Sequence, residues 1–172
     1  EDALKKDGSI KAIFAVHFTG KCVDLAGLGT LKEKYGVKIV EDAAHALGAT
    51  GAASVGDAST FSFHPVKHIT TGEGGMIATN DEAVYKKLLL LRSHGITRDA
   101  TSFENSEAFD ENGKPNPWYY EMHDLGFNYR LTDFQSALGL SQLAKLDKFV
   151  ARRKEIAARY EEAFRDFSHI KP

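Results

Sequence analysis

The first half of the chain alternates short β-branched, apolar runs with a segment of helical periodicity. Strands are predicted over residues 10–16, 37–40, 59–63 and 76–79. Between the first two, residues 24–35 predict a helix, because Asp24 can cap its start, Gly36 can end it, and leucines recur on one face. Strand, helix and strand at this spacing predict an α/β fold, a largely parallel sheet flanked by helices.

Two polar residues stand at the ends of the predicted strands. Asp42 follows the second strand, and Ser62 lies at the end of the third. Ligands of open α/β sheets gather at the carboxyl ends of the strands. We therefore expect any binding site to include this edge of the sheet.

The second half of the chain is predicted to be mostly helical. The run Thr-Asn-Asp-Glu at 79–82 predicts a capping box that opens a helix to about Ser93, with Gly95 beyond its end. The polar stretch 97–123 is too long for a plain connector, so it is either a functional loop or a mobile one. A second capping box at Thr132 and Gln135 predicts helix as far as Phe167, bending near Gly139 or near residues 145–148.

Composition excludes several classes of protein. The 172 residues suffice for a domain with a core, and 22 Lys and Arg against 24 Asp and Glu give a net charge of −2, without the basic excess of a nucleic-acid-binding domain. No apolar run approaches the roughly 20 residues of a membrane span, so no membrane partner is expected. The one cysteine, Cys22, cannot form an internal disulfide or a cysteine-based zinc site, and this fits a cytoplasmic protein without a metal.

The region from 41 to 75 holds the residue types best suited to chemistry. Asp42 follows an apolar strand and is partly desolvated there, although a helix cap or a salt bridge explains its position equally well. Lys67 lies between a predicted strand and a Gly-rich turn at 72–75. Desolvation lowers the pKa of a lysine and makes it a usable amine nucleophile. These residue types alone remain weak evidence.

The exact residues of several motifs indicate a resemblance to one protein family. Residues 40–49 read Val-Glu-Asp-Ala-Ala-His-Ala-Leu-Gly-Ala, and residues 61–75 read Phe-Ser-Phe-His-Pro-Val-Lys-His-Ile-Thr-Thr-Gly-Glu-Gly-Gly. With Gly56-Asp57, Arg-Ser-His-Gly at 92–95 and Gly-Phe-Asn-Tyr-Arg-Leu-Thr-Asp at 126–133, they closely resemble the DegT/DnrJ/EryC1/StrS sugar aminotransferases. Within that family the chain is most similar to the transaminases that make UDP-4-amino-4,6-dideoxy sugars for pseudaminic acid.

The resemblance implies a cofactor, pyridoxal 5′-phosphate, and a set of site residues. Lys67 corresponds to the catalytic lysine that binds the cofactor covalently, and Asp42 to the carboxylate that keeps the pyridine nitrogen protonated. His45 occupies a position near the cofactor ring, and Ser62 one that contacts the cofactor phosphate. Asn128 corresponds to a residue that reaches the cofactor of a neighbouring subunit, which implies a homodimer with a shared active site.

Each of these positions also has a structural interpretation. His45 can be a hydrogen-bonded histidine at a strand exit, Ser62 a packed strand hydroxyl, and Asn128 a turn residue before the Thr132 cap. The implied reaction converts a nucleotide-linked keto-sugar to an amino sugar, with glutamate as the amino donor. A branch of the family that dehydrates its substrate carries His in place of Lys67, so dehydration is disfavoured.

Two alternative functions differ in how well the sequence supports them. A nicotinamide-binding domain is disfavoured, because no Gly-x-Gly-x-x-Gly follows the first strand and the glycines at 72–75 precede a strand. The second alternative is not an enzyme: it is a non-catalytic fragment or paralogue that keeps the fold and a dimer surface.

The resemblance also predicts how the chain is divided. It implies that residues 1–146 form part of the cofactor-binding large domain of a fold-type-I transferase, and that 147–172 form a helix leading towards a C-terminal small domain. Family members are about twice this length, and their phosphate-binding loop and ring-stacking aromatic residue precede the part seen here. We therefore expect the 172 residues alone to bind the cofactor weakly or not at all.

Overall fold

A computed structural model describes residues 1–170, which divide into two compact units. Of these residues, the first unit comprises 1–78 together with 132–170, and the second comprises Thr79–Leu131. Within the described residues, the first unit contains a four-stranded sheet and the second a two-stranded sheet.

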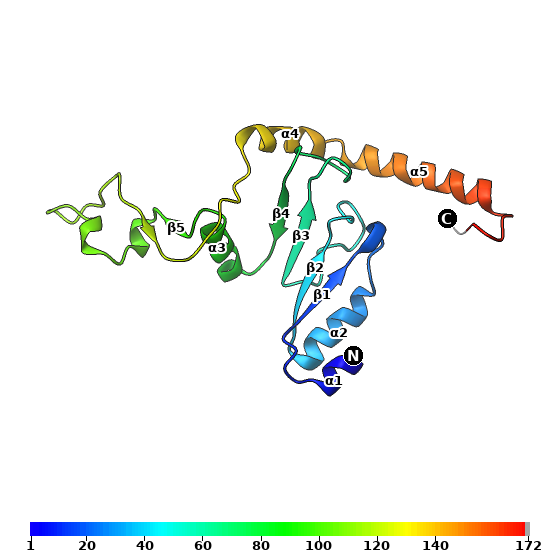
Figure 1. The fold of residues 1–172 in the computed structure, drawn as a ribbon, viewed down its shortest axis with the longest axis horizontal. Coiled ribbons are helices and arrows are strands. Elements are labelled where there is room, and N and C mark those ends of the chain that lie inside the picture. Colours follow the sequence, from blue (N-terminus) through cyan, green and yellow to red (C-terminus); the bar gives the residue numbers. More distant parts are fainter. Residues whose placement is uncertain (171–172) are drawn as a thin grey trace. The chain divides into compact units, whose positions relative to one another are not determined.

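The sheet of the first unit has the order β1-β2-β3-β4 (Figure 1). Its strands are β1 (Ala12–Val16), β2 (Lys38–Asp42), β3 (Ala58–Ser62) and β4 (Gly75–Ala78). β1, β2 and β3 are parallel, and β4 runs antiparallel to β3. The predicted largely parallel sheet is confirmed, and each strand lies within two residues of its predicted bounds.

Helix α2 (Leu25–Tyr35) connects β1 to β2 and ends as the sequence predicts. The carboxylate of its N-cap residue, Asp24, accepts a hydrogen bond from the backbone N–H of Gly27 at 3.0 Å. At the other end Gly36 adopts a left-handed conformation with φ of 61°, which only glycine enters without cost. A short helix α1 (Asp2–Lys6) and a 3₁₀ turn η1 (Phe18–Gly20) precede it.

The core lies on one face of this sheet. The parallel register pairs Ile13 with Ile39 and Ala15 with Glu41, so these side chains share a face, and Ile39 is fully buried. Full burial of a side chain of this size contributes about 2 kcal/mol. The opposite face is open, since Phe14 is 72% exposed. Strand pairing therefore places the charged Glu41 on the buried face.

Glu41 is stabilised there by a set of hydrogen-bond donors. His17, also fully buried, donates from Nε2 to the carboxylate at 2.7 Å, because its Nδ1 accepts from the backbone N–H of Val23. The carboxylate also accepts from backbone N–H groups at Ala53, Val55 and Gly56. Burial by itself raises the pKa of Glu41, but these donors outweigh it and hold the pKa below its ordinary value. The contacts fasten the β2–β3 connection to the end of β2.

Two consecutive helices complete the first unit. α4 (Asp133–Leu143) begins with the predicted capping box, in which Thr132 and Gln135 bond to each other's backbone N–H. α5 (Leu146–Phe164) follows after a break at residues 144–145. The break lies beside the predicted 145–148 region, and the alternative at Gly139 is wrong. The predicted division at 146/147 stays a prediction, and its residues 171–172 lie outside the described part.

The longest of these helices is rich in charged residues. α5 contains 19 residues, and basic and acidic side chains recur along its whole length. Among the helices of residues 1–170, none is both long and apolar enough to cross a membrane.

The second unit is built around helix α3 (Glu82–Leu91). The predicted helix is confirmed but its cap is not, because Asp81 caps the first turn while the Thr79 hydroxyl accepts from the N–H of Asp81. The helix begins at Glu82, so Asp81 is the N-cap residue and its carboxylate accepts from the N–H groups of Ala83 and Val84. Gly95 follows the helix with φ of 69°, as expected.

The long polar stretch forms short elements rather than one open loop. They are β5 (Ile96–Thr97), η2 (Ala100–Ser102), η3 (Ser106–Ala108) and β6 (Glu121–Met122), with β5 antiparallel to β6. A side chain at Gly95 would collide with the carbonyl oxygen of Asp124, so the two segments pack backbone against backbone there.

Candidate active site

A cavity in the first unit gathers residues that follow the parallel strands. Thr19 comes after β1, His45 after β2, and Lys67 and His68 after β3. The cavity has a volume of about 190 Å³, and Val66 and Arg153 complete its lining. It therefore lies where open α/β sheets bind their ligands, beyond the carboxyl ends of the strands.

Lys67 is held through its backbone. Its N–H donates to the carbonyl of His64 at 2.9 Å, and its own carbonyl accepts a hydrogen bond from Arg153 Nη2 at 3.2 Å. Among the described residues, the Lys67 amine has no hydrogen-bond or salt-bridge partner. The amine is therefore available to a ligand in the cavity.

His45 is placed by a close approach of the β1–α2 connection. The N–H of Thr19 donates to His45 Nδ1 at 3.4 Å, a long bond, and the Phe18 ring lies 5.7 Å from the imidazole. A side chain at Gly20 would stand 2.8 Å from the His45 carbonyl oxygen, and Gly20 has φ of 87°. Glycine is required here, because any larger residue would push this connection away from His45.

His68 also lines this cavity and has an unsatisfied polar atom among the described residues. Its Nδ1 is buried and, within residues 1–170, has no hydrogen-bond partner. Burial lowers the pKa of His68, and the nearby charges of Arg153 and Lys67 lower it further. The imidazole is therefore neutral near pH 7. A buried unpaired atom in a native structure is costly, so it marks a place where a partner is missing.

Asp42 and Ser62 end adjacent strands on the same face of the sheet. The register pairs Asp42 with Thr60, and Ser62 lies two residues further along β3. Asp42 Oδ1 accepts from the N–H of Ala44 at 3.0 Å, and Ser62 Oγ accepts from the N–H of His64 at 3.4 Å. Of the residues that the structure describes, the lining of the Lys67 cavity includes neither of these two.

Asn128 belongs to the second unit. It is exposed and forms an antiparallel bridge with Ser93. The structure thus brings together Lys67 and His45 in one cavity and places Asp42 and Ser62 side by side at strand ends. The roles of all five residues stay predictions.

Sequence reasoning missed Thr19, His68 and Arg153. Arg153 had a readable signal, because it lies seven residues after Leu146 and three after Val150 and so falls on the apolar face of α5. A basic residue on such a face needs a partner. Thr19 and His68 had no comparable signal, since only the fold brings them to Lys67.

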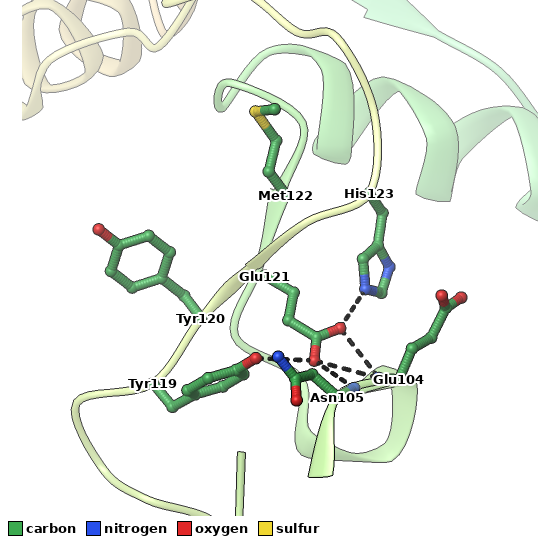
Figure 2. A pocket seen from close by; sticks show the side chains of 7 residues that line it. All are labelled: Glu104, Asn105, Tyr119, Tyr120, Glu121, Met122 and His123. Carbon is green, nitrogen blue, oxygen red and sulfur yellow. Dashed lines mark hydrogen bonds and ion pairs between the residues drawn. The ribbon is translucent and has the colours of Figure 1, made fainter. Parts of the chain in front are cut away.

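A second cavity, of about 470 Å³, lies in the second unit around Glu121 (Figure 2). The Glu121 carboxylate accepts hydrogen bonds from His123 Nε2 at 2.6 Å, from the N–H groups of Glu104 and Asn105, and from the Tyr119 hydroxyl. These donors, His123 first, lower the pKa of Glu121 to about 2. The carboxylate therefore stabilises the surrounding loop through these hydrogen bonds instead of being available to a ligand.

Comparison with known proteins identifies the family. A family model described as the DegT/DnrJ/EryC1/StrS aminotransferase family matches residues 1–172. The chain belongs to this family. Its sheet is part of the pyridoxal-phosphate-dependent aminotransferase fold, and the predicted resemblance is confirmed.

Particular family members are close in sequence and structure. The UDP-4-amino-4,6-dideoxy-N-acetyl-beta-L-altrosamine transaminase of Campylobacter jejuni is 42% identical over 175 residues, a match that covers 98% of this chain and 42% of that relative. Helicobacter pylori PseC, an aminotransferase involved in the biosynthesis of pseudoaminic acid, superposes with a TM-score of 0.82 at 35% identity, over 96% of this chain and 42% of its own.

A third family member was solved with the cofactor named in its description. The PLP-form of Spr1654 from Streptococcus pneumoniae matches with a TM-score of 0.75 and 27% identity, over 96% of this chain and 44% of its own. The chain therefore spans about two-fifths of the length of the relatives that it matches.

The donor set of the first unit fits pyridoxal phosphate. Lys67 supplies an unpaired amine, Asp42 a carboxylate with one side free of the Ala44 bond, and Ser62 a hydroxyl whose proton is not used by its bond to His64. His68, which lines the same cavity, has an Nδ1 that is unpaired among the described residues. An amine, an acid and a hydroxyl are the groups that the aldehyde, the ring nitrogen and the phosphate of this cofactor require.

Proposed function

We propose that the protein is a pyridoxal-phosphate-dependent aminotransferase that converts a nucleotide-linked keto-sugar to an amino sugar. The observation that supports this most is the unpaired Lys67 amine in a cavity shared with His45, beyond the ends of β1, β2 and β3. The motif match to the family and the name of the Campylobacter jejuni relative support a nucleotide sugar as the substrate. We infer glutamate as the amino donor from the family resemblance alone.

The residues take the following roles in this proposal. The cofactor, when bound, supplies a ring that takes up negative charge from the substrate carbon. Lys67 binds it through Nζ and, once released, moves a proton at that nitrogen. Asp42 holds a proton on the ring nitrogen by charge pairing, and Ser62 donates a hydrogen bond to the phosphate. His45 binds beside the ring.

We also propose that the active protein is a homodimer. Asn128 is exposed in the second unit and is free to contact a second subunit. In the proposed dimer its amide donates to the cofactor phosphate of the partner subunit. The remaining three-fifths of the relatives' length, which this chain does not cover, would complete the site.

Absorption spectroscopy on the natural polypeptide that contains this chain tests the proposal. With pyridoxal phosphate added, we expect a yellow protein whose visible band disappears on borohydride reduction. Lys67→Ala is expected to lack the band, while Lys148→Ala, an exposed lysine on α5, serves as the matched control and should keep it.

The alternative function predicts a different result. A natural polypeptide that stays colourless with Lys67 intact would contradict the proposal and favour a non-catalytic member of the family. A band that survives in Lys67→Ala would contradict the assignment of the lysine.

A further inference from the structure

Helix α5 contacts both segments that form the Lys67 cavity. Arg153 Nη2 donates to the Lys67 carbonyl at 3.2 Å. Towards the start of the helix, a side-chain carbon added at Gly48 would stand 3.3 Å from Val150 and 3.4 Å from Leu146, so α5 packs closely on the segment just after His45. One helix therefore touches Lys67 and the segment that follows His45.

The contacts come from one face of α5. Leu146, Val150 and Arg153 are spaced four and three residues apart, which aligns them along the helix. Arg152 lies on a different face and pairs with Glu155 on the helix surface. The apolar residues fix the helix against the sheet connections, and Arg153 extends this contact to the Lys67 turn.

We propose that Arg153 is a positioning residue for Lys67, an inference that rests on the proposed function. The side chain of Lys67 has no partner within the described residues, so its direction depends on its backbone. That backbone is held on one side by the Lys67 N–H bond to His64 and on the other by Arg153. A bond from a guanidinium to a carbonyl is charge-assisted and stronger than a neutral one, so it restrains the turn more firmly.

The position of the guanidinium supports this role. Arg153 lines the same cavity as Lys67, His45 and His68, and its charge contributes to the lowered pKa of His68. Arg153 therefore borders the cavity, although its side chain is exposed to solvent. Leu146 and Val150 pack α5 against the segment around Gly48. This packing fixes the backbone position from which the Arg153 side chain extends.

The test compares Arg153→Met, Arg153→Lys and the matched control Arg152→Met in the natural polypeptide. Hydrogen–deuterium exchange of the peptide spanning 61–71, measured without cofactor, reports directly on the turn. Selective labelling of Lys67 by pyridoxal phosphate and borohydride, measured by mass spectrometry relative to Lys148, reports on the direction of the amine. Thermal unfolding verifies that each variant is folded.

We expect Arg153→Met to speed exchange in 61–71 and to reduce selective labelling of Lys67 about tenfold, since a small misplacement of a reacting group has a large effect on rate. Arg153→Lys, which keeps a charged donor, should restore labelling to within about threefold of the wild type. Arg152→Met should change neither measurement. If Arg153→Met unfolds, the hydrogen–deuterium exchange rate of the 61–71 peptide is compared between Arg153→Lys and the wild type instead.

The outcomes separate the two proposals. Unchanged exchange and labelling in Arg153→Met would overturn the positioning role. Labelling of the wild type at lysines other than Lys67 would overturn the proposed function, and the exchange measurement would still decide whether Arg153 holds the turn.

Discussion

The cavity around Lys67 and the cavity around Glu121 differ in how their titratable groups are hydrogen-bonded. Around Lys67, the amine and His68 Nδ1 have no hydrogen-bond partner within the described residues, and His45 has one long bond. Around Glu121, donors from His123, Tyr119 and the backbone saturate the carboxylate. Because unpaired polar groups are costly, a fold keeps them where a ligand will pair them. The larger cavity is therefore the poorer candidate for a binding site.

The same contrast exists between two neighbouring residues of β2. Glu41 faces the core and accepts from His17 and from backbone N–H groups of the β2–β3 connection. Asp42 faces the opposite side, is half-buried, and its side chain accepts one bond, from Ala44, among the described residues. Because successive side chains of a strand point to opposite faces, Glu41 stabilises the core while the neighbouring Asp42 is available to a ligand.

The largest effect is expected for Lys67→Ala. In the proposed mechanism, loss of the amine removes both the attachment point and the proton carrier, so amination of a nucleotide-linked keto-sugar should fall by about three orders of magnitude or more. The assay is product formation with glutamate as donor, and Lys148→Ala is the control. Equal rates for Lys67→Ala and the wild type would refute the importance of this cavity.

A smaller loss is expected for Asp42→Asn. The amide cannot keep a proton on the ring nitrogen by charge, so the rate should fall about a hundredfold. The free energy of unfolding should change by about 0.5 kcal/mol or less, because among the described residues the Asp42 side chain makes one hydrogen bond, to the N–H of Ala44. Urea titration measures this, and a large loss of stability with unchanged rate would reverse the roles of the two carboxylates.

The complementary variant is Glu41→Gln. It leaves buried donors mismatched, and breaking a buried charged network of this kind costs about 3 kcal/mol. Urea titration of Glu41→Gln and of Asp42→Asn compares the losses in the free energy of unfolding of the two variants. A stability equal to that of the wild type would show that the Glu41 contacts are dispensable.

The smallest effect is a pH dependence confined to the second unit. Folding lowers the pKa of Glu121 to about 2 from an ordinary value of 4.5, so its stabilising contribution is complete above about pH 4.5 and is lost as the pH falls towards 2. Trp118, the only tryptophan of the sequence, has its ring 5.7 Å from that of Tyr119 and so reports on this region by fluorescence.

Glu121→Gln should remove this acid transition, while Glu104→Gln, at the same cavity, should retain it. The measurement is Trp118 fluorescence between pH 5 and 2. A transition that persists in Glu121→Gln would assign the acid sensitivity to other carboxylates.

Local rules predicted much of the fold from the sequence. The Asp24 cap, the Gly36 end and the Thr132–Gln135 capping box depend on neighbouring residues alone, and the structure confirms them. The cap of α3 was misplaced because Thr79 and Asp81 both suit the position and only the backbone path selects Asp81.

The site was less predictable for a related reason. Lys67 and His45 were found through motif resemblance, and the structure places them in one cavity. Arg153 is separated from Lys67 by 86 residues; its place on the apolar face of α5 can be read from the sequence, but its contact with Lys67 cannot. Contacts of this kind depend on tertiary packing.

The most direct test is a crystal structure of the natural polypeptide with pyridoxal phosphate bound. The account predicts continuous density from Lys67 Nζ to the cofactor, with the Asp42 carboxylate within hydrogen-bond distance of the ring nitrogen. A cofactor attached to another lysine, or a ring whose nitrogen faces away from Asp42, would contradict it.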